Sequence, residues 1–263
     1  MNQEYFLFLD KITIFMLVLL RCTGLFVIAP IFGRRSIPQY FKIGFSFFIA
    51  LVIFNTQANE SLGEISSIWV YAGIAAKEFL VGITIGYVGF LVFSGIYVAG
   101  QFIDMQIGFG IVNVLDPVSN TQVPITANFY YTITMLIFMV MDGHHLLIRA
   151  LVQSYNLVPI DSANFNSALM NDVLRVFGNI FVIALKIAAP VIAAVFITDI
   201  SLGIITKTVP QLNIFVVGMP LKIAMGLLLM VITIPVFSIL VNTMIKGVDA
   251  EMFRFLSDMG SRP

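Results

Sequence analysis

Long runs of apolar residues, broken by short polar stretches, dominate the pattern along this chain. Runs of about 20 apolar residues are typical of helices that cross a bilayer. The pattern therefore predicts an all-α membrane protein of about six long helices. The runs cover residues 12–32, 44–54, 68–99, 125–141, 172–206 and 214–246.

Several of these runs are longer than a bilayer requires. At about 1.5 Å per residue, a helix over 68–99 would be more than about 40 Å long, against about 30 Å of hydrocarbon. It must therefore break near Lys77, tilt strongly, or be shielded by protein beyond the bilayer. The last two runs flank a tight reversal and predict a helical hairpin, followed by an amphipathic extension over 247–263.

The amino-acid composition excludes several classes of function. Hydrophobic residues make up 59% of the 263 residues and charged residues 11%, against about 45–50% and about 25% in soluble domains. A soluble enzyme is excluded, and the formal net charge of zero excludes nucleic-acid binding. No set of nucleophile, base and metal ligands indicates an enzyme, and we expect no cofactor. The adjacent His144 and His145, with Asp142 beside them, could suggest a metal site, but they lack a third well-spaced ligand and are predicted to lie in a polar loop over 142–171.

Charged residues inside the apolar runs need partners, because each costs several kcal/mol at bilayer depth unless it is paired or wetted. Neighbours in sequence project about 100° apart on a helix, so Lys77 and Glu78 cannot neutralise each other. We expect these buried charges to join helices or subunits. A proton or ion relay is the alternative, although no chain of titratable groups is visible. The set is Arg21, Lys77, Glu78, Lys186 and Asp199.

Two further patterns are candidates for function. Gly82 and Gly86 form a small-xxx-small pair, which predicts a close contact between helices, although glycine is common in membrane helices anyway. The stretch 101–124 mixes apolar and polar residues without a steady period and contains turn residues. Irregular backbone at membrane depth is tolerated where it is buried in protein or lines a cavity. We therefore expect a pore-lining or plugging loop here, with an ordinary interfacial loop as the alternative.

An ordered set of short motifs gives a resemblance over essentially the whole chain. Taken together, the motifs resemble the R/T subunit family of type III secretion export gates, to which the flagellar biosynthetic protein FliR belongs. They are Arg21 ahead of Ala29-Pro30, Lys77-Glu78 leading into Gly82 and Gly86, Gln106-Ile107-Gly108-Phe109-Gly110 followed by Asp116-Pro117 and Asn120, Ala189-Pro190-Val191, and Pro220-Leu221-Lys222.

The resemblance implies a fold and a function. It implies a P-subunit-like half over 1–166 and a Q-subunit-like hairpin with its tail over 167–263. One such chain would complete a protein-conducting channel with FliP and FliQ in the bacterial inner membrane, at the flagellar basal body. FlhB and FlhA would surround it, and unfolded flagellar subunits would pass through. The plug loop would lie at about 101–124, with Gln106, Gly108, Phe109, Gly110, Asp116, Pro117 and Asn120 as its residues.

The sequence leaves a second class of function open. A stand-alone secondary transporter or ion channel would also be apolar and helical. Such a transporter typically shows two half-repeats, each with a discontinuous helix. The chain has one irregular stretch of this kind, at 101–124, and no clear mate near 210–220. The mass of the extracted complex would separate the two functions.

Overall fold

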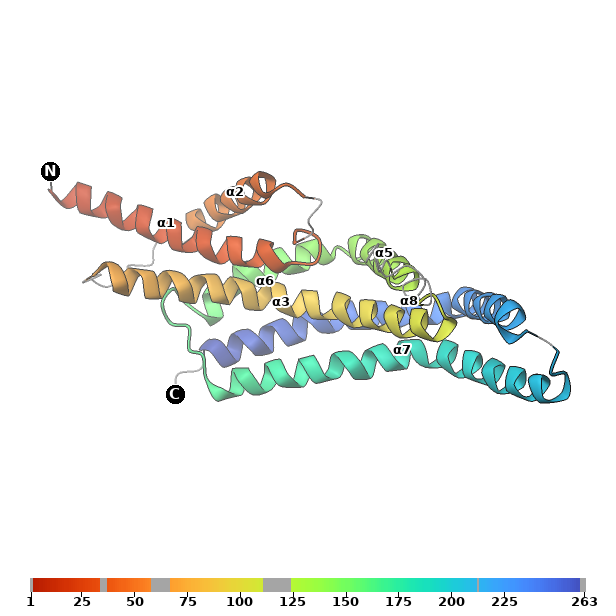
Figure 1. Ribbon diagram of the computed structural model, residues 1–263. Helices are drawn as coiled ribbons and strands as arrows, with labels where there is room; N and C mark the ends of the chain where they lie inside the picture. The colour runs from red at the N-terminus through yellow and green to blue at the C-terminus, as the bar shows by residue number, and fades with distance from the viewer. Residues whose placement is uncertain (1, 34–36, 58–66, 111–123, 212, 261–263) are drawn as a thin grey trace. The chain divides into compact units, whose positions relative to one another are not determined.

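The computed structural model describes residues 2–33, 37–57, 67–110, 124–211 and 213–260. Within these ranges every regular element is a helix, which confirms the all-α prediction (Figure 1). Among the described residues, five helices are long and apolar enough to cross a membrane, or six if a pair bent by 66° counts as one span. The helices are α1 (Asn2–Ile28), α2 (Gln39–Gln57), α3 (Ile68–Ile107), α5 (Ile125–Val140), α6 (Gly143–Leu157), α7 (Ser167–Thr208) and α8 (Ile214–Gly260).

Helix α3 is unbroken over its 40 residues, so the break considered near Lys77 does not occur. Its side chains include a buried face, with Val81, Ile85 and Val88 at most 2% exposed. Protein therefore covers this face of the helix, while strong tilt and shielding beyond the bilayer both stay predictions. Helix α2 is longer than the apolar run at 44–54. It begins at Gln39, so Phe41 and Lys42 lie in its first turn.

Two expectations about irregular structure were wrong. Residues 101–107 are the last two turns of α3 and not part of a loop. Residues 143–157, expected to be a polar loop, form α6. The reason is a buried face of helical spacing, made by Leu147, Ala150, Leu151 and Ser154, which the scattered polar residues between them conceal.

The chain divides into two compact units. The first contains Met1–Leu91, Asp142–Leu174 and Lys246–Pro263. Within it, α1 packs against α2 through edge-to-face phenylalanine pairs. The ring of Phe15 lies 5.5 Å from Phe47 and 5.7 Å from Phe54. Aromatic pairs in this geometry add to the stabilisation from burial alone.

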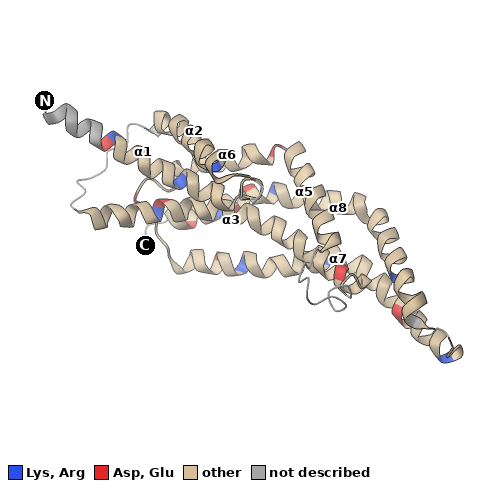
Figure 2. Ribbon diagram, turned by 45° about the horizontal axis from the view of Figure 1, so that its top comes forward, with Lys and Arg blue, Asp and Glu red and all other residues tan. Residues whose placement is uncertain are grey.

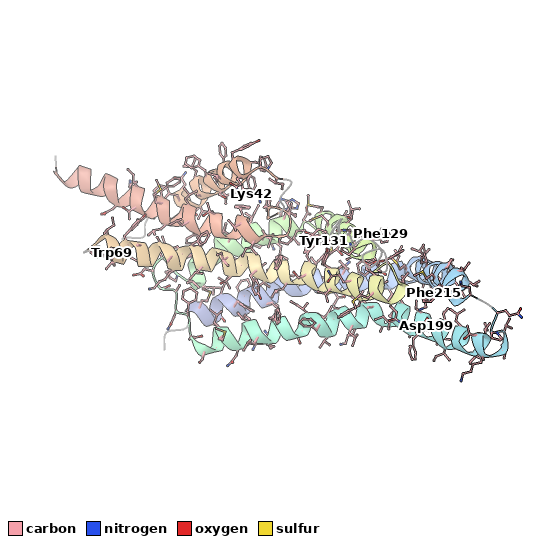
Figure 3. The ribbon with its side chains drawn as sticks, viewed as in Figure 1. Lys42, Trp69, Phe129, Tyr131, Asp199 and Phe215 are labelled. Atoms are coloured by element: carbon pink, nitrogen blue, oxygen red, sulfur yellow. The ribbon has the colours of Figure 1, made fainter. Side chains whose placement is uncertain are left out.

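The second unit contains Val92–Met141 and Arg175–Ile245. Most of α7 and the first part of α8 run antiparallel and form the predicted hairpin (Figure 1). An ion pair between Asp199 of α7 and Lys222 of α8 joins its two arms. Figure 3 labels Asp199 on α7 and Phe215 near the start of α8. Helix α5 packs on α8 through Tyr130 and Phe237, whose rings stack 4.4 Å apart.

These units do not follow the expected division at residue 166, since each takes segments from both sides of it. The two compact units are defined by contacts within the fold, whereas the expected halves are defined by likeness to separate subunits, so the two divisions need not coincide. The P-like and Q-like halves therefore stay a prediction.

Candidate functional site

A buried charge cluster in the first unit centres on Arg21 of α1. Arg21 and Glu78 are both 0% exposed, and Arg21 Nε donates to Glu78 Oε2 at 2.6 Å. Arg21 Nη1 donates to Ser154 Oγ and to the Val158 carbonyl, each at 3.0 Å. The guanidinium also lies 4.1 Å from the centre of the Tyr155 ring. Arg21 thus ties α1 to α3 and to the end of α6, and its fork of donors suits this task.

Glu78 also holds the segment that follows α6. Its second oxygen, Oε1, accepts the backbone N–H of Asp161 at 3.2 Å. The neighbouring Lys77 contacts the same residue, and its Nζ lies 3.1 Å from Asp161 Oδ1. That pair is 41% and 47% exposed, so its contribution to stability is small. The two neighbours therefore reach the same segment from α3 by a buried and an exposed route.

The two glycines singled out from the sequence lie at the contact of α1 with α3. A methyl group on Gly82 would overlap the carbonyl oxygen of Arg21, and one on Gly86 would lie 2.8 Å from the carbonyl oxygen of Leu25. Gly24 of α1 faces the backbone of Phe79 in the same way. The two backbones therefore touch, which brings Arg21 within reach of Glu78.

The candidate charges differ in their burial within this chain. Arg21 and Glu78 are buried, whereas Lys77, Lys186 and Asp199 lie on helix faces that the chain leaves at least partly open. Asp199 has Lys222 as its partner. Lys186 is exposed and has no hydrogen bond or ion pair with any described residue. Figure 2 shows how sparsely charged residues are spread along these helices.

Asp104, which no sequence motif singled out, connects the two ends of the stretch that joins α3 to α5 in the second unit. Its carbonyl accepts the N–H groups of Gly108 and Phe109 at 3.2 and 3.0 Å, where α3 ends. Its carboxylate accepts the N–H groups of Thr126 and Ala127 at 2.9 and 3.3 Å, where α5 begins. One residue therefore holds both ends of the connection.

A signal for Asp104 exists in the sequence. Helix α5 begins after Pro124, which offers no side-chain cap, so the free N–H groups of its first turn need an acceptor from elsewhere. An acidic residue near the end of the preceding helix meets that need, and its charge suits the positive end of the helix.

The predicted plug residues fall into three groups. Gln106 lies in the last turn of α3, and Gly108, Phe109 and Gly110 form the turn after it. Gly108 has a φ of +99°, a conformation that favours glycine. Asp116, Pro117 and Asn120 lie outside the described residues.

The histidine pair lies in the first turn of α6, not in a loop. The potential ligand atoms of Asp142, His144 and His145 are within 4.8 Å of one another. His145 Nδ1 is 3.4 Å from Asp142 Oδ1. Both histidines sit at a helix N-terminus, whose partial positive charge disfavours a cation. We therefore assign no metal to this group.

Comparison with known proteins gives a consistent result over nearly the whole chain. The family model described as bacterial export proteins, family 1, matches residues 12–248. The chain is 36% identical over 255 residues to the flagellar biosynthetic protein FliR of Bacillus subtilis, covering 96% of this chain and 98% of the relative. It is 29% identical over 243 residues to FliR of Escherichia coli, covering 92% and 90%. It is 26% identical over 237 residues to FliR of Aquifex aeolicus, covering 88% and 91%.

Proposed function

Because the chain belongs to the family of bacterial export proteins, family 1, we propose that it is a non-enzymatic subunit of the flagellar type III export gate. In this proposal it completes a protein-conducting channel with FliP and FliQ in the inner membrane, next to FlhB and FlhA. Unfolded rod, hook and filament proteins are its cargo. The observation that carries the proposal is the likeness to proteins of flagellar biosynthesis over 96% of the chain.

The length of the helices supports a place inside a larger assembly. Helices α7 and α8 have 42 and 47 residues, so each is about 60–70 Å long, against about 30 Å of hydrocarbon. Their surfaces stay apolar, with Ile197, Val231 and Ile239 each at least 63% exposed. Apolar surface that extends beyond the bilayer requires protein to cover it. Unlike subunits of the same apparatus are the proposed cover.

The connection between α3 and α5 is the proposed plug. Asp104 holds its two ends together, and Gly108 supplies a turn at its start. A segment anchored in this way can cover a pore at rest and swing aside without loss of the helices around it. Residues 111–123, which would form its tip, lie outside the described residues.

Deletion of residues 110–119 tests the plug. The complex should still assemble, because Asp104 and the helices are untouched, but ions should leak through the open gate. The measurement is membrane potential in intact cells together with single-channel conductance of the purified complex. A deletion variant that assembles and holds its potential as well as the unaltered protein contradicts the plug.

Two glycines in the turn give a matched pair for the same assay. An alanine in place of Gly108 must adopt a φ of +99°. Gly110 does not have a φ in this unfavourable range, and a methyl group there would meet no atom within 4 Å. A positive φ costs a non-glycine residue about 1–2 kcal/mol. Gly108→Ala should therefore leak more than Gly110→Ala, and equal leakage from the two would show that this turn does not set the resting plug.

A further inference from the structure

Lys186 lies near the middle of α7 on a surface that the chain leaves open. Its helical neighbours three and four positions away are Val182, Ile183, Ala189 and Pro190, none of which can pair with a charge. Val182 is 51% exposed, and the adjacent Leu185 is 57% exposed. The ammonium group therefore stands on an apolar helix face with no partner among the described residues.

The other charged residues of α7 either have an interaction, as Arg175 does, or occupy a favourable position. Asp172 pairs with Arg254 at 2.8 Å, and Asp199 pairs with Lys222. Lys207 lies in the last turn, where a cation suits the negative end of the helix. A lysine in the middle of an apolar membrane helix costs several kcal/mol unless something neutralises it. Lys186 thus needs a group from outside the part of the chain that the structure describes.

The backbone beside Lys186 offers a second polar group. Pro190 lies inside α7 and has no N–H, so the carbonyl of Lys186, four residues earlier, loses its helical hydrogen bond. Both residues are exposed. One position on the helix surface therefore combines a cationic donor with a free acceptor.

Small residues flank this position on the same side of the helix. At 100° per residue, Gly178, Val182, Lys186, Ala189 and Ala193 lie within about 80° around the axis, and all five are exposed. A methyl group on Gly178 would meet no atom within 4 Å. Small side chains allow another helix to approach closely in a membrane.

We infer that Lys186 is the attachment point for a membrane helix of an unlike subunit, which carries an Asp or Glu beside a hydroxyl or amide donor. This inference rests on the proposed function, because it assumes unlike membrane partners. Acyl chains can satisfy neither the ammonium group nor the carbonyl. A second copy of this chain is a poorer match, since Asp199 is already paired with Lys222 and lies about 20 Å along α7 from Lys186.

Substitutions of Lys186 in the full-length chain, expressed in the bacterium that encodes it, test the charge. Lys186→Met keeps the length of the side chain but removes the charge, and should lower the unlike subunits that co-purify at least about fivefold. Lys186→Arg should stay within about twofold of the unaltered chain because it keeps the charge. Lys207→Met is the matched control and should change nothing. Equal recovery of partners with Lys186→Met overturns the inference.

A photo-crosslinking residue at Val182 identifies what covers this face. The expected adduct joins the chain to a membrane helix of an unlike subunit that contains an Asp or Glu. Lys186→Glu should abolish the contact, and replacing the acidic residue of the partner subunit with lysine should then restore assembly of that variant. An adduct with a second copy, or with lipid alone, overturns the inference.

The two proposals fail in different ways. If unlike membrane subunits co-purify but neither the Lys186 variants nor the Val182 crosslinks involve them, the docking inference alone is wrong. If the unaltered chain co-purifies with no unlike membrane subunit, the proposed function is wrong and the docking inference falls with it.

Discussion

Replacing Glu78 with alanine should destabilise the first unit by about 3–5 kcal/mol, because it leaves a buried arginine without its counter-charge. Arg21 is 0% exposed and cannot reach water to compensate. The same change removes a second hydrogen bond, because the backbone N–H of Asp161 donates to the Glu78 carboxylate. The expected result is a lower thermal midpoint in detergent and faster proteolysis of the segment after α6.

Lys77 is the matched control for Glu78. It is adjacent in sequence, sits on the same helix and contacts the same Asp161, but its ion pair is 41% and 47% exposed. Lys77→Ala should therefore cost at most about 1 kcal/mol. Equal losses from the two variants would mean that burial of Arg21 and Glu78 is not what stabilises this unit.

Replacing Gly82 with alanine should force α1 and α3 apart, because the added methyl group overlaps the carbonyl oxygen of Arg21. Backbone atoms cannot give way as the end of a side chain can, so we expect a loss of about 2–3 kcal/mol. Separation of the helices should also lengthen the Arg21–Glu78 contact. Thermal unfolding in detergent measures the loss.

Gly73 of the same helix provides the control for Gly82. A methyl group there meets no atom within 4 Å, and alanine favours a helix over glycine by about 1 kcal/mol. Gly73→Ala should therefore leave the thermal midpoint unchanged or raise it. If Gly82→Ala behaved in the same way, the backbone contact between α1 and α3 would not be tight in the folded protein.

Apolar runs predicted the long helices well, because a membrane helix is recognisable from the apolar composition of about 20 consecutive residues. The reversal around Pro210 likewise predicted the hairpin, since a turn between two such runs leaves little choice of topology. The contact of another helix with Gly82 was also predictable, because two helix backbones approach closely in a membrane only where small residues lie between them.

Pairing was harder to predict. Arg21 and Glu78 are 57 positions apart, and the partners of Arg21 in and after α6 lie still further along the chain. No periodicity relates such positions. Asp104 was missed for a similar reason, since its role depends on an uncapped helix that begins beyond a long connection. Helix α6 was missed because its narrow buried face is diluted by polar residues.

The central claim is that this chain works only as one part of a complex of unlike membrane subunits. The most direct test is the mass and composition of the complex after gentle detergent extraction from the bacterium that encodes it. The proposed function predicts one copy of this chain with several copies of unlike membrane proteins of the flagellar export apparatus. A monomer, or a symmetric assembly of this chain alone, would contradict it and favour a stand-alone transporter or channel.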